Sequence, residues 1–130
     1  HHDTAERQLR FPTEMGVQRA MTAQWTVTGS GAYLLEKGQG NIGITGGVCG
    51  KIVDNGTKNN MDMGTAMASA AVDTIGAYLD DCHDLASLDY IVTGDLGHIG
   101  WEICQKMLLQ RGYDVKNKLL DCGMLIYDKK

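Results

Sequence analysis

The stretch that most constrains the fold is residues 88–100, where a short strand pattern runs into a glycine-rich turn and then into a helical pattern. Residues 90–93 are β-branched and aromatic, which favours a strand. Three glycines follow at every third position, and from Trp101 the apolar residues recur with helical spacing. In α/β folds, ligands bind at the carboxyl ends of strands, beside the helix starts that follow. Asp95 and His98 lie in this turn, which makes it the candidate site.

Composition narrows the class of protein. The 130 residues are 43% hydrophobic and 22% charged, which is typical of one globular domain. A net charge of −4 argues against nucleic-acid binding, which needs a basic surface. No apolar run approaches the length of about 18–20 residues that spans a bilayer, so we expect a soluble chain without a transmembrane segment. The four cysteines form no C-x-x-C pair, and they predict reduced thiols rather than a metal site.

The apolar pattern predicts an α/β architecture with a mixed sheet and flanking helices. Asp62 is a suitable N-cap for one helix, and Gly112 suits the C-terminal end of the helix that contains Trp101. The first two strands can pair antiparallel, whereas helices between the later strands imply right-handed crossovers and parallel pairing. The expected strands lie at residues 25–36, 42–53, 90–93 and within 119–127, including 124–127, and the expected helices cover residues 63–80 and the stretch from 101 to 112.

One alternative function rests on the glycine spacing. Gly94, Gly97 and Gly100 follow a strand and open a helix, and Asp114 lies twenty residues beyond Gly94, near where a ribose-binding acid would fall. The dinucleotide fingerprint is G-x-G-x-x-G, however, and the spacing here is G-x-x-G-x-x-G. A nicotinamide-dependent oxidoreductase therefore stays open as an alternative. A serine hydrolase is excluded, because the sequence around Ser30 is not G-x-S-x-G and no helix pattern follows it.

Short motifs over nearly the whole chain resemble the stage V sporulation protein AD family of endospore-forming bacteria. They lie at residues 4–14, 26–32, 62–64, 93–96 and 121–127. The resemblance implies a thiolase-like fold with two similar α/β halves, in proteins considerably longer than 130 residues. The chain is then expected to be partial: residues 1–37 end the first half with a lid loop and a strand, and residues 38–130 begin the second half.

The same resemblance implies a non-catalytic binding protein. The family binds dipicolinic acid and belongs to the machinery that moves it, with calcium, into the developing spore. Condensing enzymes of this fold place a catalytic histidine just beyond the strand that residues 90–93 resemble, and Gly94 and Asp95 occupy that place here. The general base and oxyanion donor of acyl transfer are then missing. A thiolase-type acyltransferase remains a further alternative.

The resemblance also implies partners and a location. The expected partners are the other stage V sporulation channel proteins and a second copy of the full-length chain in a homodimer, with no nucleic acid. The expected location is the forespore, peripheral on the inner membrane. No cofactor is expected besides the ligand, dipicolinic acid, which calcium can accompany.

The chemistry of dipicolinate selects the candidate contacts. This planar dianion needs cations or N–H donors for its two carboxylates, and arginine suits carboxylates best. The start of the helix after the turn offers N–H donors and a favourable dipole. Asp95 would repel the bare dianion, so we expect it to hold an arginine or to share the calcium. The predicted ligand-binding residues are Arg7, Arg10, Gly94, Asp95, Gly97 and His98, with no catalytic residue and no metal-ligand set.

Overall fold

The chain forms an α/β structure, as the sequence predicts. The computed structural model describes residues 10–11, 26–27, 31–38, 40–59, 62–82 and 84–126. The elements in chain order are β1 (Arg10–Phe11), β2 (Thr26–Val27), α2 (Met63–Cys82), the 3-10 turn η1 (Leu85–Ser87), β3 (Ile91–Thr93), α3 (Gly97–Gln110), β4 (Leu119–Asp121) and α4 (Cys122–Ile126).

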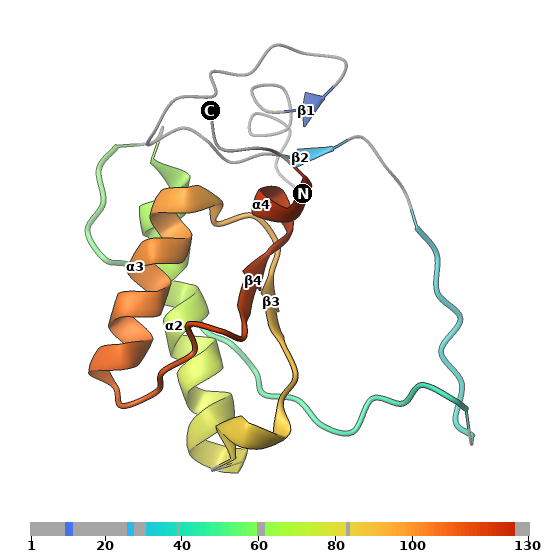
Figure 1. Ribbon diagram of the computed structural model, residues 1–130. Coiled ribbons are helices and arrows are strands. Elements are labelled where there is room, and N and C mark those ends of the chain that lie inside the picture. Colours follow the sequence, from blue (N-terminus) through green and yellow to red (C-terminus); the bar gives the residue numbers. More distant parts are fainter. Residues whose placement is uncertain are drawn as a thin grey trace.

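The centre of the described structure is a β-α-β unit. β3 and β4 pair in parallel, with Ile91 opposite Leu119 and Thr93 opposite Asp121, and α3 connects them. α2 and α3 pack side by side on one face of this two-stranded sheet (Figure 1). The buried core lies between these helices and the sheet. It consists of Ala68, Val72, Leu79, Leu96, Cys104, Leu108, Val115 and Leu119.

Local signals fix the bounds of both long helices. The carboxylate of Asp62 accepts a hydrogen bond from the Thr65 N–H at 3.2 Å, so Asp62 is the N-cap that the sequence predicts for α2. α3 ends at Gln110, and Gly112 just beyond it has a φ of 95°, a left-handed conformation that favours glycine. The Gly112 N–H donates to the Leu109 carbonyl and the Tyr113 N–H to the Leu108 carbonyl, both at 2.9 Å. This pair of bonds is a Schellman motif, and it confirms the predicted end of the helix.

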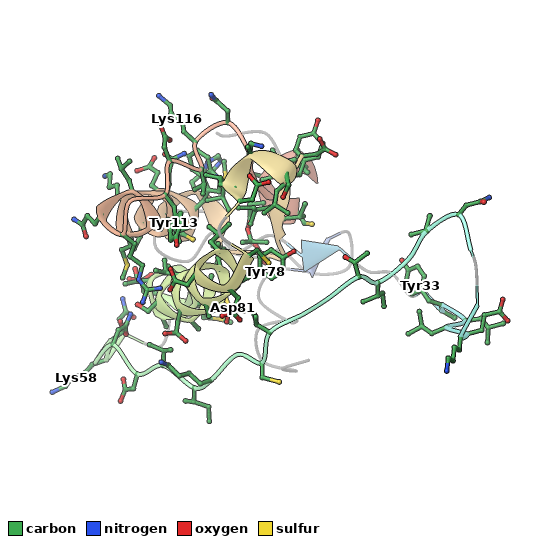
Figure 2. All side chains as sticks on the ribbon, turned by 90° about the horizontal axis from the view of Figure 1, so that it is seen from below. Tyr33, Lys58, Tyr78, Asp81, Tyr113 and Lys116 are labelled. Atoms are coloured by element: carbon green, nitrogen blue, oxygen red, sulfur yellow. The ribbon has the colours of Figure 1, made fainter. Side chains whose placement is uncertain are left out.

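The segment before α2 lies along that helix without joining a sheet. Lys51 forms an ion pair with Asp73 at 3.0 Å, and Asn55 donates to the Thr65 carbonyl at 2.9 Å. The segment therefore runs antiparallel to α2. Farther from the helix, the apolar side chains of Ile42 and Tyr33 are more than 90% exposed, and Figure 2 shows Tyr33 on an arm well away from the helices.

Three of the predicted strands are shorter in the structure or absent from its described part, and two of these precede α2. The strand expected at residues 25–36 is β2, only two residues long, and residues 42–53 are extended but lie in no sheet. Their expected antiparallel pairing is absent among the described residues, where β2 pairs in parallel with β1. The predicted mixed sheet is thus two parallel pairs in this part of the chain. Extended residues form a strand only where a neighbouring backbone pairs with them, and residues 42–53 have no such neighbour in this part of the structure.

The last predicted strand is also shorter than expected. β4 ends at Asp121, and residues 122–126, expected to continue it, form the helix α4. The physical reason is a cap, since the Asp121 carboxylate accepts a hydrogen bond from the Met124 N–H at 3.3 Å. The start of one helix also differs from the prediction. α3 begins at Gly97, four residues before Trp101, where the sequence pattern places its start.

Candidate functional site

The candidate site is the turn between β3 and α3, at the carboxyl end of the strand. The structure brings four of the six predicted contact residues together here: Gly94, Asp95, Gly97 and His98. Gly97 is the first residue of α3 and has a φ of 64°, a conformation that favours glycine. Asp95 and His98 are half-buried, whereas Gly94 is exposed. The turn therefore places one carboxylate and one imidazole, whose Nε2 atom is buried, beside the first N–H groups of a helix, which lack partners within the helix itself.

The positions of the two predicted arginine side chains lie outside the described structure. Arg7 lies outside the described residues. Arg10 belongs to β1, where its backbone pairs with Thr26 of β2, and its side chain is outside the described part. Their contact with a ligand stays a prediction.

A buried carboxylate that the sequence analysis missed lies directly beneath the turn. Asp121, at the end of β4, is only 2% exposed. Its Oδ2 accepts hydrogen bonds from the Leu96 N–H at 2.8 Å and from the Thr93 hydroxyl at 2.7 Å. Because a strand was expected to continue to residue 127, Asp121 was not recognised as a cap. An aspartate immediately before a short apolar run is the signal that could have found it.

Cys104 packs close to this carboxylate inside α3. Its side chain is fully buried. Burial, and secondarily the negative charge of Asp121, raises the pKa of the thiol from 9.0 to about 11. A thiol with this pKa stays protonated at neutral pH, which disfavours nucleophilic chemistry at Cys104.

The glycine-rich turn does not assemble the dinucleotide set. Gly100 packs against α2: a Cβ built on it would lie 2.8 Å from the Gly64 carbonyl oxygen, so close helix packing accounts for this glycine. Asp114 follows the C-terminal end of α3, and a helix of 14 residues is about 20 Å long. Asp114 therefore lies far from Gly94, at the opposite end of the helix from the turn.

Metal ligands do not converge in the described part of the chain. None of the described residues form a group of three or more His, Cys, Asp or Glu side chains that could hold a metal ion. Cys49, Cys82 and Cys122 are exposed free thiols. A calcium ion at the turn would thus need oxygen atoms from the ligand itself or from elsewhere in the protein.

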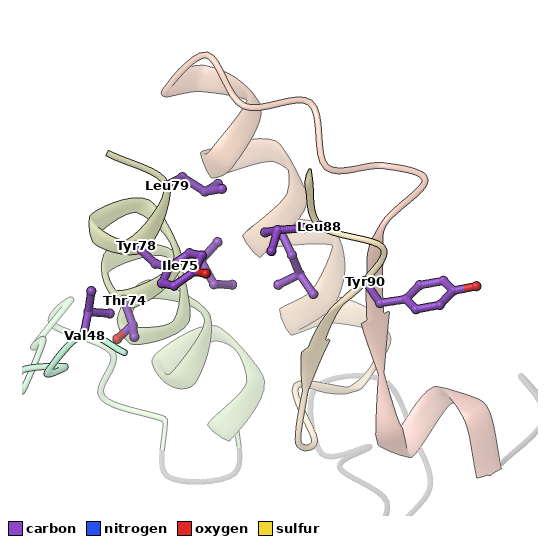
Figure 3. A pocket seen from close by; sticks show the side chains of 8 residues that line it. Val48, Thr74, Ile75, Tyr78, Leu79, Leu88 and Tyr90 are labelled. Carbon is purple, nitrogen blue, oxygen red and sulfur yellow. The ribbon is translucent and has the colours of Figure 1, made fainter. Parts of the chain in front are cut away.

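A separate apolar pocket lies between α2 and the start of β3, at the opposite end of that strand from the candidate turn. The pocket has a volume of about 260 Å³. Figure 3 shows the side chains that line it, with the Tyr90 ring pointing away from α2. Its described lining residues are Val48, Thr74, Ile75, Tyr78, Leu79, Leu88, Tyr90 and Ile91, none of them charged. Such walls offer no charged partner for a carboxylate, so this pocket does not suit a dianion.

Comparison with known proteins decides the family. A family model described as Stage V sporulation protein AD (SpoVAD) matches residues 1–130. The chain belongs to the stage V sporulation protein AD family. Among curated proteins, Stage V sporulation protein AD of Bacillus subtilis (strain 168) is 48% identical over 128 residues. These residues make up 98% of this chain and 38% of that protein, so the chain spans well under half the length of its relative.

Family membership confirms the resemblance seen in the sequence motifs, and the family is named for a sporulation protein. Among the described residues, no helix combines the length and the hydropathy that crossing a bilayer requires.

Proposed function

We propose that the chain is part of a non-catalytic protein that binds dipicolinic acid during its uptake, with calcium, into the developing spore. The observation that carries the proposal is the turn of residues 94–98, which gathers Asp95 and His98 at the N-terminus of α3 in a member of a sporulation family. The resemblance to thiolase-like proteins supports a fold of two halves, to which the β3-α3-β4 unit would contribute.

The chemistry of the turn supports binding rather than catalysis. Acyl transfer in condensing enzymes uses a histidine just beyond the strand, and Gly94 and Asp95 follow β3 here. The one buried cysteine near the turn, Cys104, has a raised pKa and is held as a thiol. Asp121 already accepts two backbone N–H groups and a hydroxyl, which occupies a carboxylate that could otherwise act as a base.

Cations must come to the turn from elsewhere in the protein. Asp95 is acidic, and a dianion needs compensation by arginine, by calcium or by both. Arg7 and Arg10 precede the described core and are the arginines we assign to this role. The other stage V sporulation channel proteins are the proposed partners at the forespore inner membrane, and the full-length protein is proposed to be a homodimer.

Calorimetry on the full-length protein tests the proposal. Dipicolinate, NAD and an acyl-CoA are titrated separately, each with and without calcium. We expect binding of dipicolinate alone among the three. Tight binding of NAD, or turnover of the acyl-CoA, would replace the proposal with the oxidoreductase or the acyltransferase.

Substitutions then test the contacts. Arg7→Ala and Arg10→Ala should each weaken dipicolinate binding about tenfold to a hundredfold, the loss expected for one charge-assisted hydrogen bond. Asp95→Ala should weaken binding only when calcium is present, if Asp95 shares the ion. Lys106→Ala is the matched control, because Lys106 is an exposed cation on α3 more than two turns beyond the candidate turn. If the arginine variants fold and bind like the parent, the ligand lies elsewhere.

A further inference from the structure

Asp121 is the buried charge in the described structure, and burying a carboxylate is costly unless donors compensate it. Its compensation comes from hydrogen bonds that all stabilise the carboxyl end of the sheet. One oxygen accepts the Leu96 N–H and the Thr93 hydroxyl, at 2.8 and 2.7 Å. The other accepts the Met124 N–H at 3.3 Å. The carboxylate therefore ties the end of β4 to the turn after β3 and to the start of α4.

Two of the hydrogen bonds to Asp121 come from residues in or next to the candidate turn. Leu96 lies between Asp95 and Gly97. Its N–H donates to the carboxylate of Asp121, which is 25 residues away in sequence. Thr93, the last residue of β3, is held just before the turn, where its hydroxyl also donates to the Leu120 carbonyl at 3.1 Å. The start and the centre of the turn are thus fixed to β4, and this attachment sets the backbone direction of Gly94 and Asp95 between them.

We infer that Asp121 is a positioning residue for ligand binding at the turn of residues 94–98. This inference rests on the proposed function of that turn. Asp121 does not contact the ligand. It fixes the turn so that the Asp95 carboxylate and the first N–H groups of α3 face the ligand together, before the ligand arrives.

The test compares variants of the full-length protein by dipicolinate calorimetry and by hydrogen exchange of the peptide that contains Leu96. In Asp121→Ala, the Leu96 amide should exchange at least tenfold faster, and the Kd for dipicolinate should rise at least tenfold. Asp121→Asn should restore both to within threefold of the parent, because its amide oxygen can still accept from Leu96 and Thr93.

Two controls separate positioning from general stability. Leu79→Ala removes a fully buried side chain of α2 and should lower the melting temperature at least as much as Asp121→Ala does, with the Kd within twofold of the parent. Asp84→Ala removes another aspartate that accepts two backbone N–H groups, those of Ala86 and Ser87. That aspartate lies before β3, at the opposite end of the sheet, and its loss should leave both readouts of the turn unchanged.

The outcomes distinguish this inference from the proposed function. If the parent binds no dipicolinate, the proposed function fails whatever the exchange rates show. If the parent binds but Asp121→Ala binds equally well, or if Leu79→Ala weakens binding as much, the inference is overturned while the function stands. Should Asp121→Ala not fold, Thr93→Val removes one donor to the carboxylate and should raise the Kd at least threefold. Unchanged binding in that variant would overturn the inference as well.

Discussion

Gly100 of α3 lies directly against the backbone of Gly64 of α2. A Cβ built on Gly100 would lie 2.8 Å from the Gly64 carbonyl oxygen and 3.0 Å from its Cα. Both glycines are buried, and they sit near the N-terminal ends of their helices. The two helices are therefore in close backbone contact beside the candidate turn, where there is no room for a side chain.

The first prediction concerns this contact. Gly100→Ala should lower the free energy of unfolding by about 1–3 kcal/mol, because overpacking against backbone forces the helices apart. Gly76→Ala is the matched control on α2. There the obstructing atoms belong to the end of the Arg111 side chain, which can move if it gives up its hydrogen bond to the Val72 carbonyl, and alanine gains about 1 kcal/mol of helix propensity over glycine. Denaturant unfolding checks both variants, and equal losses in the two would contradict the packing argument.

The second prediction concerns the end of α3. Gly112→Ala should destabilise the protein by about 1–2 kcal/mol, because an L-residue strains the left-handed conformation that the Schellman motif requires. Gly38→Ala should change stability by less than about 0.5 kcal/mol, since Gly38 is exposed and no atom lies within 4 Å of the added Cβ. A neutral Gly112→Ala in thermal or denaturant unfolding would show that the motif does not hold the helix end.

The sequence predicted those parts of the fold whose signals are local. Asp62 caps α2 and Gly112 ends α3 through bonds to residues within five positions, so the residue types alone indicate these bounds. The turn after β3 was found for the same reason, because a strand pattern and a helix pattern flank its glycines. Four of the predicted contact residues therefore lie together in the structure.

The parts that depend on distant partners were not predictable in this way. Residues 119–127 form a short apolar run, and periodicity cannot separate a buried strand from a short helix in such a run. The cap from Asp121 to the Met124 N–H starts α4 and is a local signal. The bonds of Asp121 to Thr93 and Leu96, which hold the carboxylate at the end of β4, span 28 and 25 residues and leave no local pattern. Residues 42–53 carry strand-forming residues, but a strand also needs a paired neighbour, which no local pattern reports.

The third prediction concerns Lys118, which precedes β4. Its ammonium group donates to the carbonyl oxygens of Leu85 at 3.1 Å, of Ala86 at 3.2 Å and of Leu88, and so holds η1 to the start of the sheet. Lys118→Met should cost about 1–3 kcal/mol of stability, because three carbonyls, two of them in part-buried bonds, lose a charged donor. Lys116→Met should be nearly neutral, as that side chain extends into solvent (Figure 2). Similar unfolding midpoints for the two variants would argue against this role of Lys118.

The fourth prediction concerns the pH dependence of stability. Burial, and secondarily the charge of Asp121, raises the pKa of Cys104 from 9.0 to about 11 in the folded protein. Above pH 9 the unfolded chain loses the thiol proton while the folded chain keeps it, so the folded state binds more protons and stability falls as the pH rises. The full contribution is present below pH 9 and is lost progressively between pH 9 and pH 11. From pH 8 to pH 10 the loss should be about 1 kcal/mol.

Cys104→Ala supplies the control for this pH effect. The variant starts from a lower stability, because it leaves a cavity where a fully buried side chain packed. It should nevertheless lose about 1 kcal/mol less than the parent between pH 8 and pH 10, since the lysines and tyrosines that titrate in the same range are common to both. Urea unfolding at the two pH values measures the difference. Parallel losses in the parent and in Cys104→Ala would mean that the thiol ionises equally easily in the folded and unfolded chains, and that its place beside Asp121 is not sealed from water.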